Sequence, residues 1–301
     1  MAEPFTPKNL DSIIFTIEEN EESKKISKLL NSIDAEPNNL QLVDELLSLY
    51  IKITKVKSDV SYMGYAKAFL TPYLKKYPRS YMLKMHLVDI LQYTHKFDEA
   101  LLLLKSIKSI REAKPYLVTA TIYQAREDYN ASLLACKKLI FRASHLLSAT
   151  CISSMQSHLG KLEPSYKLLQ DVYAKAKNEE SSEKSWALTS LADMAYRLDK
   201  KEEAIAYLQE VLLLDTKDYF ALKKLSEIYL EQENYTEVKV LLEEYEYVDS
   251  LLLRLTVARE KLGENVSLAK ENLKAFVKAL KLRDEKPHKE DLPYFNMLGI
   301  K

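Results

Sequence analysis

The sequence predicts an all-α fold, built as a solenoid of about seven two-helix hairpins with an N-terminal capping helix. Composition is the first reason: 4 Gly and 9 Pro in 301 residues leave few breaks, and Leu, Ala, Lys, Glu and Tyr dominate, which favours long helices. The second reason is a motif that recurs seven times along the chain, and the third is a set of short turns that recur with it.

The recurring motif is a small residue followed four places later by a larger, mostly apolar one. Its copies are Ala66/Leu70, Ala100/Leu104, Ser132/Cys136, Ser165/Leu169, Ala204/Leu208, Val238/Leu242 and Ala269/Leu273. Successive copies are 34, 32, 33, 39, 34 and 31 residues apart. Small residues let paired helices cross closely, while larger ones fill the groove between them. Because a single hairpin exposes an apolar face, neighbouring hairpins must stack to cover it.

The elements are expected in the following order. Residues 1–18 form a loosely ordered arm, and residues 21–33 form the capping helix. The seven hairpins follow over residues 38–78, 81–112, 113–144, 146–177, 185–216, 219–248 and 250–283. The predicted division of the chain is an arm with its capping helix over 1–37, a solenoid over 38–283 and a C-terminal tail over 284–301.

The turns inside the hairpins support these boundaries. Gly160 and Gly263 stand where the first helix of a hairpin must stop, because glycine tolerates the left-handed cap. Residues 95–98 and 199–202 occupy the equivalent turn in two other hairpins. The longest interval coincides with a polar loop, residues 178–183, where we expect a slight hinge within one continuous domain.

Two consecutive copies of the repeat show the fullest pattern. Leu188, Leu191, Ala192 and Ala195 precede Ala204 and Leu208, and one period later Leu222, Leu225, Ser226 and Tyr229 precede Val238 and Leu242. This pattern resembles the tetratricopeptide repeat (TPR) superfamily, whose period is 34, over about residues 38–283. The resemblance implies a right-handed superhelix whose first helices line a concave groove, and a non-enzymatic scaffold that binds another protein or a peptide there.

A narrower resemblance rests on three segments, residues 62–73, 184–189 and 249–255. They are similar to a group of uncharacterised bacterial TPR proteins, many of which are exported. That resemblance implies the periplasm or the exterior as the location if the native chain carries a signal peptide. The N-terminus shows no such signal, so a cytoplasmic location stays open as well.

Charge and hydropathy exclude two classes of partner. Lys plus Arg (44) equals Asp plus Glu (44), without long blocks of either sign, whereas nucleic-acid binding normally needs a basic patch. No apolar run approaches the roughly 18 to 20 residues that cross a bilayer. We therefore expect no nucleic-acid partner and no membrane insertion.

Motifs for catalysis, cofactors and metals are also absent from the sequence. It contains no Gly-rich phosphate loop, HExxH, CxxC or GxSxG, and its five histidines lack ligand spacing. Adjacent carboxylates such as Glu202 and Glu203 fit solvated helix faces, because a catalytic carboxylate needs a perturbing environment. We therefore expect no enzyme activity, no catalytic residue, no metal site and no cofactor.

The two cysteines, Cys136 and Cys151, are too few for a disulfide framework. We expect two buried thiols, since cysteine behaves as a small core residue. A single bridge is the alternative, because an antiparallel helix pair that turns near Ala143 would place the two about opposite each other.

The partner is expected to contact first-helix residues that lie between the packing positions. They are Met82, Met85, Asp89, Gln92, Tyr93, Thr121, Gln124, Thr150, Ser154, Ser157, Trp186, Thr189, Asp193, Tyr196, Arg197, Phe220, Lys223 and Glu227. Aromatic anchors beside adaptable polar groups suit an extended or helical peptide. The alternative is that Trp186 and Phe220 pack on the preceding helix, and that Met82 and Met85 fill gaps in the core.

Two other functions are weighed beside protein binding. One is a module that binds a small ligand or glycan near Trp186, Tyr196 and Tyr93. The other is an RNA-associated helical-repeat protein, against which the balanced charge argues.

The C-terminal tail is apolar for a terminus, from Leu292 to Ile300. We expect it to cover the exposed face of the last helix, which has no further neighbour. The alternative is insertion into the groove of its own chain or of a second copy. The expected oligomeric state is accordingly a monomer, or a weak homodimer through this tail.

Overall fold

A computed structural model gives the fold and describes residues 20–57, 60–107, 111–177, 179–282 and 286–300. Within these ranges the regular structure consists of sixteen α-helices and one short 3-10 helix, with no strand among the described residues. The predicted all-α fold is confirmed. The chain falls into two compact units, an N-terminal unit of residues 2–122 and a C-terminal unit of residues 123–301. The predicted arm, residues 1–18, lies outside the described ranges.

The N-terminal unit holds the capping helix and the first hairpins. Its helices are α1 (Glu21–Ala35), α2 (Leu40–Lys57), α3 (Ser61–Lys76), α4 (Tyr81–Tyr93), α5 (Phe97–Ser106) and α6 (Lys114–Ala125), whose last three residues belong to the other unit. Helix α1 begins where predicted because Asn20 and Ser23 exchange side-chain to backbone hydrogen bonds of 2.8 and 3.0 Å, a capping box. Apolar residues of α1 to α4 form one buried cluster that joins the capping helix to the first hairpins.

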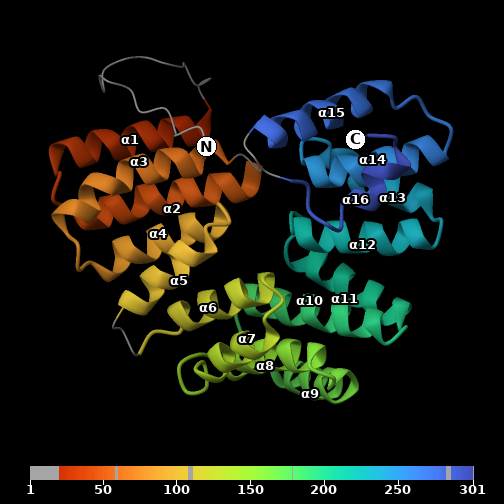
Figure 1. The fold of residues 1–301 in the computed structure, drawn as a ribbon, viewed down its shortest axis with the longest axis horizontal. Helices are drawn as coiled ribbons and strands as arrows, with labels where there is room; N and C mark the ends of the chain where they lie inside the picture. Colours follow the sequence, from red (N-terminus) through yellow and green to blue (C-terminus); the bar gives the residue numbers. More distant parts are fainter. Residues whose placement is uncertain (1–19, 58–59, 108–110, 178, 283–285, 301) are drawn as a thin grey trace. The chain divides into compact units, whose positions relative to one another are not determined.

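The C-terminal unit holds the remaining hairpins. Its elements are α7 (Tyr129–Lys137), α8 (His145–His158), α9 (Leu162–Lys175), α10 (Ser181–Arg197), α11 (Lys201–Leu214), α12 (Tyr219–Glu231), α13 (Tyr235–Leu242), η1 (Glu243–Tyr245), α14 (Asp249–Lys261), α15 (Ser267–Leu282) and α16 (Leu292–Met297). Within this stack, α10 packs on its own second helix α11 and on α8, the first helix of the preceding hairpin (Figure 1). In the same way α12 packs on its second helix α13 and on α14, the first helix of the following hairpin. Two apolar clusters run through this stack, as expected when hairpins cover one another's faces.

Six successive hairpins share one backbone turn between their two helices. The residue with positive φ is His95, Glu127, Gly160, Asp199, Glu233 or Gly263, with φ between 56° and 83°. In each case the next residue donates its N–H to the carbonyl five positions earlier, at 2.8 to 3.1 Å, which closes a Schellman cap. The left-handed caps predicted at Gly160 and Gly263 are confirmed, and the same geometry occurs in the turns predicted to be equivalent.

The expectation of two buried thiols is wrong, because Cys136 and Cys151 form a disulfide. The chain turns back between α7 and α8, which places the two Cα atoms 5.4 Å apart in the buried interior. The bond joins the second helix of the third hairpin to the first helix of the fourth.

The polar loop between the fourth and fifth hairpins is shorter than predicted. Helix α10 begins at Ser181, so residues 181–183 are helical, while residue 178 lies outside the described ranges. The carboxylate of Glu183 accepts a hydrogen bond of 2.5 Å from the hydroxyl of Ser144, the N-cap of α8, and this contact ties the first turn of α10 to its neighbour. The slight hinge and the predicted domain limits at 37 and 283 stay predictions.

Candidate functional site

The first helices of the fifth and sixth hairpins, α10 and α12, enclose a pocket of about 310 Å³. It is lined by Thr189, Ala192, Asp193, Tyr196, Arg197, Leu208, Phe220, Lys224, Glu227, Ile228 and Glu231. Six of these residues are predicted partner contacts: Thr189, Asp193, Tyr196, Arg197, Phe220 and Glu227. We call the surface that α10, α12 and α14 present around this pocket the first-helix face.

The pocket combines an apolar base with aromatic side chains. Ala192, Leu208 and Ile228 are buried at 4% exposure or less. Phe220 is 53% exposed, and the Lys224 ammonium lies 5.9 Å from the centre of its ring. An exposed aromatic ring beside a buried apolar base offers contact area to a partner's side chain at little cost in conformational entropy.

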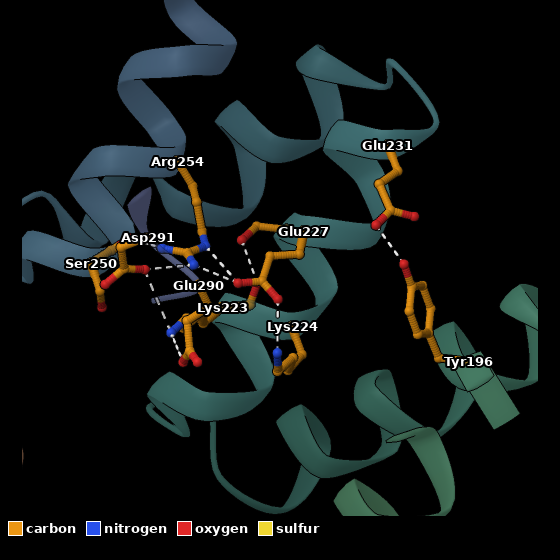
Figure 2. Close-up of polar contacts among 10 residues, drawn as sticks. Tyr196, Lys223, Lys224, Glu227, Glu231, Ser250, Arg254, Glu290 and Asp291 are labelled. Carbon is orange, nitrogen blue, oxygen red and sulfur yellow. Dashed lines mark hydrogen bonds and ion pairs between the residues drawn. The ribbon is translucent and has the colours of Figure 1, made fainter. Parts of the chain in front are cut away.

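Tyr196 is held at the rim of the pocket by a carboxylate. Its hydroxyl donates a 2.5 Å hydrogen bond to Glu231, which also pairs with the Lys201 ammonium at 3.2 Å (Figure 2 shows the Tyr196 contact). The hydrogen bond to Glu231, together with burial, raises the pKa of Tyr196 to about 12. The phenol therefore stays neutral at physiological pH and its ring is fixed in orientation.

Arg197 links the pocket to α8. Its guanidinium lies 3.2 Å from the carboxylate of Asp193 and donates to the hydroxyl of Ser157 and to Nδ1 of His158 at 2.5 and 2.8 Å. Burial, followed by the positive charge of Arg197, lowers the pKa of His158, whose ring stacks on Tyr129 with centroids 4.3 Å apart. The neutral imidazole can then accept the guanidinium hydrogen bond.

A second polar cluster lies next to the pocket, around the fully buried Arg254 of α14. Its guanidinium binds Glu227 of α12, donates 2.7 Å to the carbonyl of Ser250 and pairs with Asp291 at 2.8 Å (Figure 2). Lys223 lies between Glu290 and Asp291, 3.6 Å from the latter. Three cations, those of Lys223, Lys224 and Arg254, thus face three carboxylates, those of Glu227, Glu290 and Asp291.

The tail that supplies Glu290 and Asp291 packs on α14, and its apolar residues join a cluster that α15 also helps to build. Figure 1 shows α16 beside α14, and Phe295, Leu298 and Ile300 are buried in the apolar cluster that α12 to α15 build. The Arg254 guanidinium lies 4.7 Å from the centre of the Tyr294 ring. Burial, together with the charge of Glu227, raises the pKa of the Tyr294 hydroxyl to about 12. The tail therefore combines features of both expectations, since it contacts the first helices α12 and α14 of its own chain and buries apolar residues in the cluster that α15 shares.

Four predicted partner contacts are buried: Met85, Thr150, Ser154 and Ser157. Thr150, Ser154 and Ser157 do not lie on an open surface, because α8 packs against α7, α9 and α10 and buries eight of its 14 residues. Its small side chains leave room for these close approaches. Met85 fits the gap-filling alternative.

The remaining predicted contacts lie outside the pocket. In the N-terminal unit Met82 and Tyr93 pack on the core, Asp89 pairs with Lys114 at 2.7 Å, and Gln92 donates 2.9 Å to Thr121. In the C-terminal unit Gln124 and Trp186 are partly exposed, and Lys223 belongs to the Arg254 cluster. Whether any of these residues contacts a partner stays a prediction.

Sequence reasoning missed two groups of residues. Lys224 and Glu231 lie one helical turn after the predicted Phe220 and Glu227, so extending the same helix faces by one turn would have found them. For Arg254 a signal was present, since it is the one charged residue in the apolar run from Leu251 to Ala258.

No protein-family model matches the sequence, and no curated protein matches it. Among solved structures, the APC/C hetero-tetramer Cut9–Hcn1 matches with a TM-score of 0.54 at 13% identity over 83% of this chain. This chain spans 48% of that one. The chain has the tetratricopeptide-type fold. A TPR protein from Parabacteroides merdae ATCC 43184 also matches, with a TM-score of 0.49 at 14% identity, over 85% of this chain and 98% of that one.

Among the residues that the structure describes, no group of three or more His, Cys, Asp or Glu is placed to hold a metal ion. Within those same ranges, no helix is both long enough and apolar enough to cross a membrane.

Proposed function

We propose that this chain is a non-enzymatic TPR scaffold that binds a segment of a partner protein on its first-helix face. The observation that carries the proposal is the pocket between α10 and α12, which has six predicted contact residues in its lining. A pocket of this size takes one large apolar or aromatic side chain of the partner. Asp193, Arg197 and Lys224 at its rim then bind the partner's backbone and polar groups.

Two further points support a binding role. Helical-repeat folds commonly mediate protein interactions, and the Cut9–Hcn1 structure that this chain resembles is itself an assembly of several chains. The polar groups around the pocket are held by contacts within the chain, as Tyr196 is by Glu231. Little conformational entropy is then lost when a partner binds such a pre-formed surface.

The test is affinity capture from a lysate of the source organism, with quantitative mass spectrometry. The bait is the wild-type chain or the double variant Tyr196→Ala/Phe220→Ala, which removes both rings of the pocket. We expect the proteins retained by the wild type to fall about tenfold or more with the variant, because buried aromatic anchors dominate interface energies. Circular dichroism checks that the variant is folded.

A matched control removes two exposed apolar side chains from second helices. Leu213 of α11 and Val240 of α13 are 85% and 69% exposed. The double variant Leu213→Ala/Val240→Ala is expected to retain every wild-type partner. The proposal fails if the folded pocket variant keeps those partners, or if only the control variant loses them.

The second candidate function is the binding of a small ligand in the same pocket. Its volume of about 310 Å³ favours this reading, since ligand pockets span roughly 300 to 1,000 Å³. A thermal-shift screen of metabolites and sugars separates the two functions. A ligand that raises the melting temperature of the wild type, but not that of Tyr196→Ala, would support the second candidate.

A further inference from the structure

The C-terminal tail occupies part of the first-helix face in the way a bound peptide would. Its polar anchors are Lys223 and Glu227 on α12 and Arg254 on α14, and the first two are predicted partner contacts. Its apolar anchors Phe295, Leu298 and Ile300 are buried against the same hairpins. The tail is thus a built-in example of a segment that this surface accepts.

The charges that hold the tail indicate a releasable contact. The loss of hydration when two charges are buried offsets much of the attraction between them. Apolar side chains of similar volume therefore often stabilise a buried interface as well as an ion pair does, or better. When the tail leaves, Glu290 and Asp291 recover their hydration, which offsets part of the lost contact.

The charge balance of the emptied site selects its occupant. Without Glu290 and Asp291, Glu227 is the carboxylate that remains paired with Lys224 and Arg254, and Lys223 loses both of the carboxylates it pairs with. Burial acts to raise the pKa of Glu290, but the hydrogen bond and charge of Lys223 outweigh it and hold that pKa below its ordinary value. The emptied site therefore favours a carboxylate.

The spacing within the tail adds a second requirement. The backbone turns from Asp291 into α16, and the N–H groups of Tyr294 and Phe295 both donate to the Asp291 carbonyl at 3.1 Å. Within one turn of the carboxylate, this geometry places the Tyr294 ring beside the Arg254 guanidinium and buries Phe295. Leu298 follows one turn later and is buried as well.

We propose that the site around Lys223 and Arg254 binds a partner segment with an acidic residue followed, three and four positions later, by aromatic residues and then by an aliphatic one. The tail competes with that segment and is displaced by it. The inference rests on the proposed function and names the chemistry of the partner. It extends the binding surface from the pocket to α14, because Glu227 borders both sites.

The test uses a chain that lacks residues 288–301 and three fluorescent peptides. The first peptide has the sequence of residues 288–301, and the second keeps only Glu290, Asp291, Tyr294, Phe295 and Leu298 and has Ala or Ser elsewhere. The third is the second with Asn in place of its aspartate. Fluorescence anisotropy measures their binding to the shortened chain and to the full chain.

We expect the shortened chain to bind the first two peptides, and to bind the third about tenfold more weakly. The full chain binds all of them about tenfold more weakly than the shortened chain does, because its own tail competes. The variant Lys223→Met in the shortened chain binds the first two peptides more weakly, because Lys223 pairs with Glu290. It keeps the preference for aspartate over asparagine, because Arg254 holds the Asp291 carboxylate at 2.8 Å. A folded shortened chain that binds neither of the first two peptides, or binds the aspartate and asparagine peptides equally, overturns the proposal.

Removal of the tail exposes an apolar surface, so a second variant covers the case of a shortened chain that does not fold. The full chain with Glu290→Gln and Asp291→Asn keeps the tail but removes its charges. We expect it to bind the first peptide more tightly than the wild-type chain does. Equal binding by the two chains contradicts competition by the tail.

The pocket variant separates this inference from the proposed function. Suppose that a shortened chain with Tyr196→Ala/Phe220→Ala still binds the peptides, and that partner capture is unchanged by these two substitutions. The result then supports the site around Lys223 and Arg254 and contradicts binding in the pocket. Capture that depends on the pocket, without peptide binding, rejects this inference alone. Light scattering tests whether a second copy of the chain is the occupant instead. If the full chain dimerises through its tail and binds neither of the first two peptides, the occupant is a second copy and the proposed partner is wrong.

Discussion

Arg254 illustrates at the residue scale how one charge fixes a local structure. It is fully buried, and Glu227, Asp291 and the carbonyl of Ser250 take up its donors. Such a residue is stable inside the protein only while its partners remain, because an unpaired buried charge is costly.

The variant Arg254→Ala should be strongly destabilised. It leaves the carboxylates of Glu227 and Asp291 without their shared partner, and the loss of one member of a buried ion pair costs about 3–5 kcal/mol. Urea unfolding followed by circular dichroism measures the loss. As a control, Lys167→Ala breaks a pair with Glu163 in which both side chains are exposed, and it should leave the midpoint unchanged. Equal effects would contradict the buried network.

His158 should titrate below its ordinary pKa of 6.5, because burial and the charge of Arg197 both lower that pKa. The unfolded chain then binds this proton more readily, so the histidine lowers the stability of the fold as pH falls below about 6.5. NMR titration of the imidazole protons measures the midpoint. The variant Arg197→Met should raise it. The control Arg259→Met, which removes a guanidinium paired with Glu246 and Glu264 in the same unit, should not. A titration midpoint that is the same with and without Arg197 would contradict the contact between Arg197 and His158.

The sequence predicts residues of the site where helix periodicity alone decides which way a side chain points. Thr189, Asp193, Tyr196 and Phe220 are such residues, and all four line the pocket. Periodicity fails for Thr150, because burial there depends on how closely the neighbouring helices approach α8. Helix periodicity could not predict the contact of Asp291 with Arg254, because the position of Asp291 depends on where the tail packs against α14.

At the scale of elements, the turn inside each hairpin is the most regular feature of the chain. The same Schellman cap closes six first helices, although only two of the six positive-φ residues are glycine. Gly160 and Gly263 were recognisable for that reason. Glu127 and Glu233 adopt the same conformation because the stacked hairpins impose it, and nothing at those two positions in the sequence indicates a left-handed residue.

Two glycine substitutions should have opposite signs. Gly160→Ala places a Cβ at φ +83°, where the left-handed conformation costs an L-residue about 1–2 kcal/mol. Gly64→Ala lies inside helix α3 with no atom within 4 Å of the new Cβ, so it should stabilise by about 0.5–1 kcal/mol. Thermal unfolding of both variants checks the prediction. Destabilisation by Gly64→Ala would contradict the helix assigned there.

The disulfide should stabilise the contact between the third and fourth hairpins. It closes a loop with a sequence separation of 15, and loops of about that length contribute about 3 kcal/mol by restricting the unfolded chain. We expect Cys136→Ala/Cys151→Ala to lower the free energy of unfolding by about 2–4 kcal/mol. Dithiothreitol should lower the unfolding midpoint of the wild type and leave that of the variant unchanged. Equal responses to dithiothreitol would contradict the bond.

At the scale of the whole molecule, the repeat predicts the architecture well because every hairpin solves the same packing problem. Six of the seven small motif residues are buried at 2% exposure or less, from Ala66 to Val238. The repeat does not predict where the chain departs from it, as in the two-unit division near residue 122 and the return of the tail to α14. Both depend on contacts that occur once in the chain.

The central claim is that a partner binds the first-helix face of the C-terminal unit and displaces the tail. Amide hydrogen exchange of the full chain, alone and saturated with a captured partner, tests both parts in one experiment. We predict slower exchange in α10 and α12, and faster exchange in residues 292–300 as α16 leaves α14. Slower exchange confined to the second helices α9, α11 and α13, with α16 unchanged, would contradict the account.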